Sequence, residues 1–445
     1  MRTSSFPLVI AALLCASPVA AQQQGRPERP YRGIFGGGVS DAEQLLTVNF
    51  GVSGGYDDNV LANASEGGAI GLPTDPRVAK SGGFGEANAD LAYSLNRTRV
   101  GFGASLATTQ RLYTTENGSS LGTYTGGASG WFELAKRTRL SVSASSAYQP
   151  FLSYSFFPVP VASEAELVEI VEPNFDLAFS RQSQWRHSIA ASLTQGLSSR
   201  ASLSFGGGYD LTAASDDRFD QKNYSGNGRF TLGISRGFGV HFGYGYQDAR
   251  YSSEAQAGRS PVIHDLDIGV DFNRALSISR RTRLTFGTGS TAMKDRNQTV
   301  YRITGNARLS HEFRRTWNAA LAYDRDAGFL QNLHEPTFSD SLAISVGGMA
   351  TRRVQISTQL GAALGSVGVS SSNDYDSYFG SASATVALSR YVGVNVSYSN
   401  YRYSFDRSVE LPVLTPRETN RQVVQGGMSL WLPLIHRSRR PNATR

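Results

Sequence analysis

The residues best suited to chemistry in this sequence do not combine into a catalytic centre. Gly51-Val-Ser53-Gly-Gly55 has the spacing of a serine nucleophile elbow, but it lies in an alternating, strand-like stretch instead of at a strand–helix turn. The six histidines are scattered, and His311-Glu312 is not followed by a second histidine at zinc-binding spacing. No phosphate-binding loop occurs. We therefore expect no catalytic residue, no cofactor, no metal site and no enzyme.

A second set of residues could select solutes. Charged residues alternate with apolar ones in many segments, so they would point to the face opposite the apolar one. If these segments close into a barrel, that face lines the lumen. The predicted lumen residues are Glu86, Asp90, Arg111, Glu133, Arg186, Arg229, Asp265, Asp267, Asp271, Arg302, Arg308, Glu312 and Asp324.

The two signs of charge in this set allow two interpretations. The plainer one is a solvated wall whose internal ion pairs keep the barrel round. The sharper one is a transverse field, which orders water and selects polar or charged solutes. Asp265, Asp267 and Asp271 would form an acidic stripe that attracts cations, unless arginines on neighbouring strands pair with them.

The elements that would position these residues are strands. Apolar and small polar residues alternate with a period of two, which indicates strands with one apolar face. Most segments are about 9–13 residues long, close to the length that a tilted strand needs to cross a bilayer. The segments are 46–56, 87–95, 100–112, 124–134, 140–148, 185–193, 203–211, 224–234, 238–246, 266–278, 284–291, 301–313, 317–323, 342–350, 354–364, 378–388, 392–398 and 424–432.

Short turns that carry arginine join these strands in pairs. They lie at residues 96–99, 136–139, 198–200, 235–237, 280–283, 314–317, 351–353 and 389–391. Longer connections alternate with them, which is the asymmetry of an outer-membrane barrel with short periplasmic turns. The pattern predicts an all-β fold: a transmembrane antiparallel up-and-down β-barrel of about 18 strands, with 16 as the alternative.

Local composition and charge suggest how the chain divides into segments. Residues 1–21 resemble a cleavable signal peptide, which contains the one cysteine of the chain, Cys15. We expect a periplasmic lead-in at 22–44, the barrel at 45–435 and a basic tail at 436–445. The mean hydropathy of −0.28 suits a barrel, because only alternate strand residues face lipid. The pI near 9.4 does not indicate nucleic acid, because the arginines are dispersed.

The connection at residues 149–176 is the most unusual outer loop. It contains Phe151, Phe156 and Phe157, followed by Glu164, Glu166, Glu169 and Glu172. Apolar residues in a long outer loop need a place to bury. Insertion into the lumen would make this a constriction loop lined by the glutamates; the alternatives are an external cap, longer flanking strands or a contact with a neighbouring subunit.

The outer loops and the last strand carry two further signals. Acidic residues of the outer loops, such as Asp57 and Asp58, could hold divalent cations that bridge lipopolysaccharide, although ordinary turn chemistry is the favoured interpretation. The last strand, Gln425-Gly-Gly427-Met-Ser-Leu430-Trp-Leu432, fits the pattern by which barrel C-termini are recognised for assembly. We expect Pro433 to end it.

The motifs Tyr56-Asp-Asp-Asn-Val and Leu276-Ser-Ile-Ser-Arg-Arg-Thr-Arg-Leu-Thr-Phe resemble those of the β-barrel porin 2 (OmpL-like) family of outer-membrane proteins. Related barrels are often associated with exopolysaccharide loci. The resemblance implies an outer-membrane channel or export component, and it assigns no catalytic or ligand-binding residue.

The sequence thus predicts a porin-like channel in the outer membrane of a Gram-negative bacterium, for diffusion or export of polar solutes. The first alternative is a plugged structural or accessory barrel in envelope or polysaccharide assembly; the second is an outer-membrane lipid hydrolase. Expected partners are outer-membrane lipid and lipopolysaccharide, the barrel-assembly machinery and polysaccharide-export components, but no nucleic acid. The oligomeric state stays open.

Overall fold

The strands and most of the short turns are the parts of the chain that the structure describes. A computed structural model describes residues 42–59, 81–114, 120–153, 178–180, 183–215, 220–235, 237–252, 261–275, 281–295, 298–313, 316–329, 333, 335–368, 373–409, 411 and 417–438. No helix among these residues is long and apolar enough to cross a membrane.

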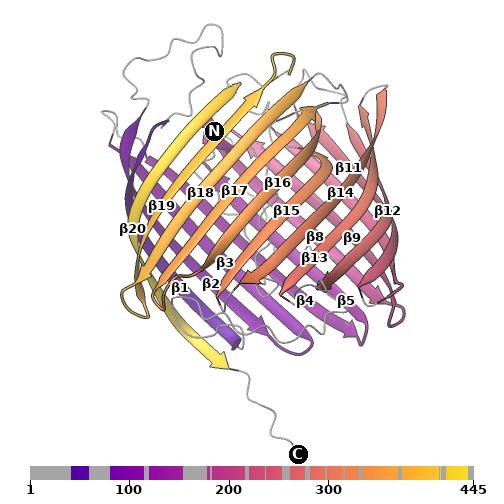
Figure 1. Cartoon of the computed structure of the whole chain (residues 1–445), viewed down its shortest axis with the longest axis horizontal. Coiled ribbons are helices and arrows are strands. Elements are labelled where there is room, and N and C mark those ends of the chain that lie inside the picture. The colour runs from indigo at the N-terminus through magenta and orange to yellow at the C-terminus, as the bar shows by residue number, and fades with distance from the viewer. Residues whose placement is uncertain are drawn as a thin grey trace, which may run out of the picture.

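Eighteen strands form one antiparallel sheet that closes on itself (Figure 1). The strands of its first half are β1 (Ala42–Asp57), β2 (Gly82–Asn96), β3 (Val100–Tyr113), β4 (Ser120–Ala135), β5 (Thr138–Gln149), β8 (Gln184–Gly196), β9 (Ala201–Ala214), β10 (Gln221–Gly233) and β11 (Phe238–Tyr251). The second half contains β12 (Val262–Ala275), β13 (Thr282–Asp295), β14 (Gln298–Phe313), β15 (Trp317–Phe329), β16 (Pro336–Met349), β17 (Val354–Val367), β18 (Asp374–Ala387), β19 (Val392–Phe405) and β20 (Glu418–Ser438). Two short strands, β6 (Leu152–Ser153) and β7 (Ala178–Ser180), form a separate ladder.

Each strand of the large sheet pairs with its neighbours in sequence, and β1 pairs with β20 to close the ring. Closure pairs the first strand of the sheet with the last, which is how a sheet can satisfy its backbone in an apolar surrounding. The prediction of an all-β, antiparallel up-and-down barrel with about 18 strands is therefore confirmed. The arginine turns join the predicted pairs of strands, from β2–β3 to β18–β19.

The ends of the closing strands differ from the prediction. β1 already begins at Ala42, inside the expected lead-in, and β20 continues through Pro433 to Ser438, inside the expected tail. The reason is pairing: Ala42 lies opposite Ser438, and a register shift between Leu46 and Thr47 absorbs the irregularity next to Pro433. A proline is tolerated at such a bulge because its missing N–H interrupts the ladder there anyway.

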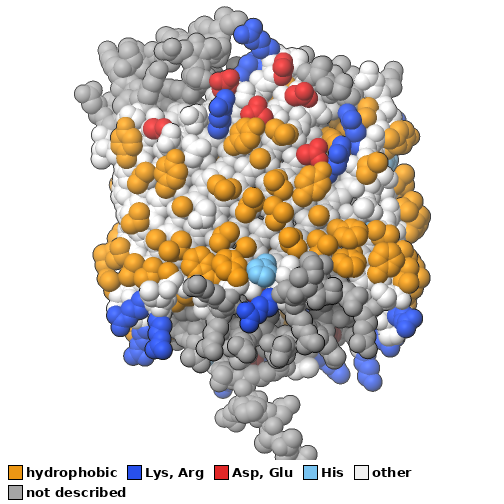
Figure 2. Space-filling view, viewed as in Figure 1, with side chains coloured by type: hydrophobic (Ala, Val, Ile, Leu, Met, Phe, Trp, Pro, Cys, Tyr) orange, Lys and Arg blue, Asp and Glu red, His pale blue; other side chains and the backbone are white. Residues whose placement is uncertain are grey.

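The outer surface carries an apolar band between two charged rims (Figure 2). Alternate strand residues such as Phe50, Leu106 and Leu360 are exposed on it, at 47%, 61% and 53%. Lys and Arg side chains gather at the lower end of the view, where β20 ends, whereas both signs of charge occur at the upper rim (Figure 2). An apolar belt with polar ends is the surface that a bilayer requires.

Candidate functional site: the inner wall of the barrel

The register of the ladders assigns each residue to the inner or the outer wall. Residues directly opposite each other on antiparallel strands share one face. From the exposed Phe50 this relation can be followed round the whole ring, through pairs such as Asn49↔Asp90, Glu86↔Arg111 and Thr291↔Arg302. It places the predicted lumen residues other than Asp267 on the face opposite the apolar belt. The side chain of Asp267 lies outside the described part of the chain.

Ion pairs cross strands on this inner face, and the first joins β2 and β3. Arg111 Nε of β3 lies 2.8 Å from Glu86 Oε2 of β2, and the arginine is 3% exposed. Arg111 also covers the ring of Phe84, with its Cζ 4.1 Å from the ring centroid. These contacts match the plainer interpretation of the charges for this pair, because each charge neutralises a neighbour on the wall.

The second ion pair belongs to a group on β10, β11 and β12. Arg229 Nη2 donates to both oxygens of Asp271 at 2.8 Å, and His241 Nδ1 lies 3.0 Å from Asp271 Oδ2. His241 Nε2 is 3.0 Å from the Thr288 carbonyl oxygen. Asp271 is therefore no member of an unpaired acidic stripe. Asp265 instead accepts a hydrogen bond from Gln247 at 3.4 Å.

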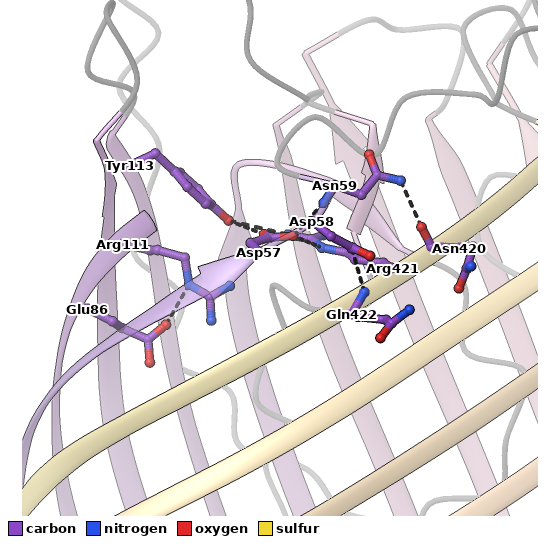
Figure 3. A network of polar contacts seen from close by, with 9 residues as sticks. All are labelled: Asp57, Asp58, Asn59, Glu86, Arg111, Tyr113, Asn420, Arg421 and Gln422. Carbon is purple, nitrogen blue, oxygen red and sulfur yellow. Dashed lines mark hydrogen bonds and ion pairs between the residues drawn. The ribbon is translucent and has the colours of Figure 1, made fainter. Parts of the chain in front are cut away.

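A buried polar network ties together the strands that close the barrel (Figure 3). Arg421 of β20 binds Asp57 of β1 with two hydrogen bonds: Nε to Oδ1 at 3.1 Å and Nη2 to Oδ2 at 2.5 Å. Tyr113 of β3 donates to Asp57 Oδ2 at 3.0 Å. The side chains of Asp57 and Arg421 are 0% and 2% exposed. Both side chains are thus buried from solvent, on the inner side of the seam.

The residues that follow Asp57 extend this seam (Figure 3). Gln422 N–H donates to Asp58 Oδ1 at 2.7 Å, and Asn59 Nδ2 donates to the Asn420 carbonyl oxygen at 3.1 Å. The Tyr56-Asp-Asp-Asn motif therefore fastens β1 to β20. The carboxylates of Asp57 and Asp58 are thus engaged in hydrogen bonds within the barrel.

An apolar cluster lies across the outer end of the lumen. Tyr401 and Tyr403 of β19 are 1% and 0% exposed, and they pack with Leu333 and Val409 from two outer connections. The other members of the cluster are Ala363, Val367, Tyr375 and Phe405, with Phe379 and Leu411 beside them.

Ala214 of β9 also packs against this apolar cluster. β9 and β18 lie opposite each other in the ring, because the same number of strands separates them in either direction. These strands are β10–β17 on one side and β8, β5–β1, β20 and β19 on the other. The cluster on β17–β19 therefore reaches residues of the opposite wall. Its effect is to narrow the outer mouth.

A tight turn holds Val409 in this cluster. Asp406 Oδ1 accepts hydrogen bonds from the Ser408 N–H and Oγ, both at 3.1 Å, and Arg417 donates to the Val409 carbonyl oxygen at 3.0 Å. The hydrogen bonds from Ser408 lower the pKa of Asp406 below the usual value for an aspartate. The turn is thus built around an ionised carboxylate at neutral pH.

The first residue of the predicted constriction loop lies inside the barrel. Phe151 is 1% exposed and packs against Leu121, an inward residue of β4. Its carbonyl oxygen lies 3.5 Å from Gln184 Nε2. The other predicted constriction residues lie outside the described part of the chain: Phe156, Phe157, Glu164, Glu166, Glu169 and Glu172.

The remaining predicted lumen residues are spread round the wall and do not converge. Asn49 Nδ2 donates to Asp90. Each of the others stands opposite an inward residue of a neighbouring strand: Glu133 opposite Arg139, Arg186 opposite Thr212, Arg308 opposite Ala322, Glu312 opposite Asn318 and Asp324 opposite Asn306. No group of three or more metal-ligating side chains occurs among the described residues.

Sequence reasoning allowed for an arginine partner of Asp271, but it missed the network at the seam and the contact of His241 with Asp271. The alternation that puts Asp57 inward also puts Arg421 and Tyr113 inward, so parity was a usable signal. Their contact could not be read from it, because it depends on β20 returning beside β1. His241 was dismissed as a scattered histidine, although it faces inward next to Arg229.

Comparison with known proteins gives similar barrels and no close relative. No family model matches the chain, and no curated protein matches it, so the resemblance to the OmpL-like family gains no support. Among solved structures, Pseudomonas aeruginosa OccK2 (OpdF) in complex with glucuronate is similar at 10% identity and a TM-score of 0.44, over 88% of this chain and 99% of that chain.

Two further solved structures show the same level of similarity. Pseudomonas aeruginosa OccK7 (OpdD) matches at 11% identity and a TM-score of 0.44, over 89% of this chain and all (100%) of that chain. The siderophore receptor PirA from the same organism matches at 8% identity and a TM-score of 0.40, over 87% of this chain and 80% of that chain.

Proposed function

We propose that this protein is an outer-membrane channel through which polar solutes diffuse passively. The observation that carries the proposal is the inner wall: charged residues of both signs face the lumen, and the apolar residues face out. A polar lumen inside an apolar belt lets water and solutes pass where lipid does not. The chemistry requires no catalytic group, in keeping with the expected absence of enzyme activity.

The alternative proposal is a plugged barrel with a structural or accessory role in the envelope. The apolar cluster that reaches from β19 to Ala214 favours it, because it narrows the outer mouth. In both proposals the signal peptide directs export across the inner membrane and is then cleaved, and the last strand of the barrel is recognised by the barrel-assembly machinery. Site-specific crosslinking from β20 to that machinery during folding would test this partner.

Single-channel conductance in planar bilayers separates the two proposals. We expect a stable current from the wild-type barrel, and a larger one from Tyr403→Ser, which removes a fully buried ring from the cluster. Tyr398→Ser is the matched control, because Tyr398 lies on the same strand, faces out and is 41% exposed. Absence of current in a barrel with intact strand signal by circular dichroism would reject the channel and leave the plugged barrel.

The loop at residues 149–176 supplies a second test. We infer that it enters the lumen, which the burial of Phe151 against Leu121 supports. Deletion of residues 151–172 should then raise the conductance and reduce any preference for cations. Unchanged conductance would leave the loop outside the pore.

A role in the export of an exopolysaccharide is proposed on the family resemblance alone, and the charge of its solute is a separate question that the same assay can address. Addition of uronate-containing oligosaccharides to one side of the bilayer should interrupt the current if they enter the lumen. Neutral oligosaccharides of equal length are the control. Equal block by both would point to a size filter without charge selection.

A further inference from the structure

The ladder between β14 and β15 stops well before either strand ends. The two strands pair from Phe313↔Trp317 only as far as Gly305↔Arg325. Beyond that point β14 remains paired with β13 to Gln298, and β15 remains paired with β16 to Phe329. A gap therefore opens in the outer half of the wall, on the side that faces the viewer in Figure 1.

The outer ends of β15 and β16 are tucked inside the ring. By alternation Phe338 of β16 continues the outward row of Leu342 and Ile344, which are 40% and 39% exposed. Phe338 is only 6% exposed, and it packs against Ile263 and Met293, which point inward from β12 and β13. The outer face of this hairpin end thus lies against the inner face of the neighbouring wall.

The surface beside the gap is unusually open. Tyr301 and Ile303 of β14 are the two most exposed large apolar side chains among the described residues, at 75% and 74%. Tyr301 stands opposite Ala292, which stands opposite His264, and His264 stands opposite Tyr246. Tyr301 lies three residues from the outer end of β14, which begins at Gln298, and aromatic side chains near strand ends are typical of the membrane–water interface.

Two arginines flank the gap. The Cζ atoms of Arg302 and Arg325 lie 5.4 Å and 5.2 Å from the ring centroid of Phe338. The Nε–H of each is buried and has no hydrogen-bond acceptor within the described ranges. Arg325 Nη1 also lies 3.6 Å from Asp340 Oδ1, in an ion pair whose two side chains are both partly exposed. A buried guanidinium donor without an acceptor costs free energy that an anionic group would recover. Arginine is also the residue that best matches the geometry of carboxylate and phosphate oxygens.

We propose that the gap between β14 and β15 binds an amphiphile with an anionic head group. The head group accepts hydrogen bonds from Arg302 and Arg325 at the level of the outer rim. The alkyl chain runs down the outer face of β14, past Tyr301 and Ile303, where the missing neighbour leaves apolar surface uncovered. The inference rests on the membrane placement proposed above, but it does not require an open lumen.

Native mass spectrometry of the barrel released from neutral detergent tests the site, with dodecyl phosphate as the probe. We expect one tightly retained dodecyl phosphate per barrel and no comparable retention of dodecyl maltoside. R302Q/R325Q should lower retention at least tenfold. The single variant R325Q should lower it less, and because Arg325 is 41% exposed, this substitution leaves the fold intact. Arg308→Gln is the matched control, since Arg308 faces inward on the paired part of β14.

Further arms identify the source of the ligand and separate the failures. Preference for laurate over lysophosphatidate would indicate a free fatty acid, and the reverse a glycerolipid of the membrane. Unchanged retention in R302Q/R325Q, or an equal loss in Arg308→Gln, would overturn the proposal. Retention without conductance would reject the channel alone, and conductance without retention would reject this site alone.

Discussion

Breaking the buried ion pair at the seam should be the most damaging single change in the described part of the barrel. Arg421→Met removes the guanidinium and leaves the Asp57 carboxylate 0% exposed with Tyr113 as its remaining side-chain donor. Loss of one partner of a buried pair typically costs about 3–5 kcal/mol, because the other charge stays desolvated. The two hydrogen bonds from Arg421 at 3.1 and 2.5 Å place this pair at the strong end of such contacts.

The double variant D57N/R421M distinguishes the cost of an unpaired charge from the loss of a contact. The introduced asparagine would carry no charge and could still accept from Tyr113, so we expect the double variant to recover more than half of the stability lost in R421M. Arg97→Gln is the control. Its ion pair with Glu43 at 3.2 Å has side chains that are 61% and 29% exposed, and it should contribute under about 1 kcal/mol.

The assay is equilibrium unfolding of the refolded barrel in detergent by guanidinium chloride, followed by tryptophan fluorescence at neutral pH. Comparable slopes with denaturant would show that the variants unfold from similar native states. A loss in R421M no larger than in Arg97→Gln would refute the reasoning. A double variant that is less stable than R421M would also refute it, because the unpaired charge of the Asp57 carboxylate would then not be the source of the lost stability.

Two further outcomes follow from close contacts and from charge. Gly427→Ala should destabilise the barrel by about 1–3 kcal/mol, measured by the same unfolding assay, because the new Cβ would overlap the Val52 carbonyl oxygen across the closing ladder. The carboxyl of Asp406 should titrate below the usual aspartate pKa near ~3.9, read from the carboxyl carbon shift by NMR, and Ser408→Ala should raise its midpoint. Since the folded pKa is depressed, this carboxylate stabilises the turn at neutral pH, and the contribution disappears as pH falls through the folded pKa; an unchanged midpoint in Ser408→Ala would contradict it.

The architecture was predictable because it repeats. Alternation over each segment fixes a strand, and a turn such as residues 136–139 fixes the direction in which the chain returns. Summed over many hairpins, these local signals determine strand number and sidedness. The strand ends were less predictable: Pro433 looks like a terminator in isolation, but the partner strand and a register shift accommodate it.

Contacts across the ring were not predictable, because they depend on distances that no local pattern contains. Asp57 and Arg421 are separated by almost the whole chain, and only closure brings them within hydrogen-bond distance. The inward turn of Phe338 also breaks the alternation rule on which the parity argument relies. Its burial follows from the hairpin end leaving the wall, which is a tertiary event.

The seam between β1 and β20 and the junction between β14 and β15 differ in how firmly they hold the barrel closed. At β1–β20 the barrel is fastened by a buried ion pair, and the strands approach so closely at Gly427 that no side chain would fit there, so this seam should open last. At β14–β15 the ladder is incomplete, and the junction is filled by Phe338 and two arginines whose Nε groups lack acceptors within the described chain. A barrel needs all its ladders to exclude lipid from its backbone. The unpaired stretch of β14 is therefore where an added molecule stabilises the wall most, and where local opening should be detected first by hydrogen exchange.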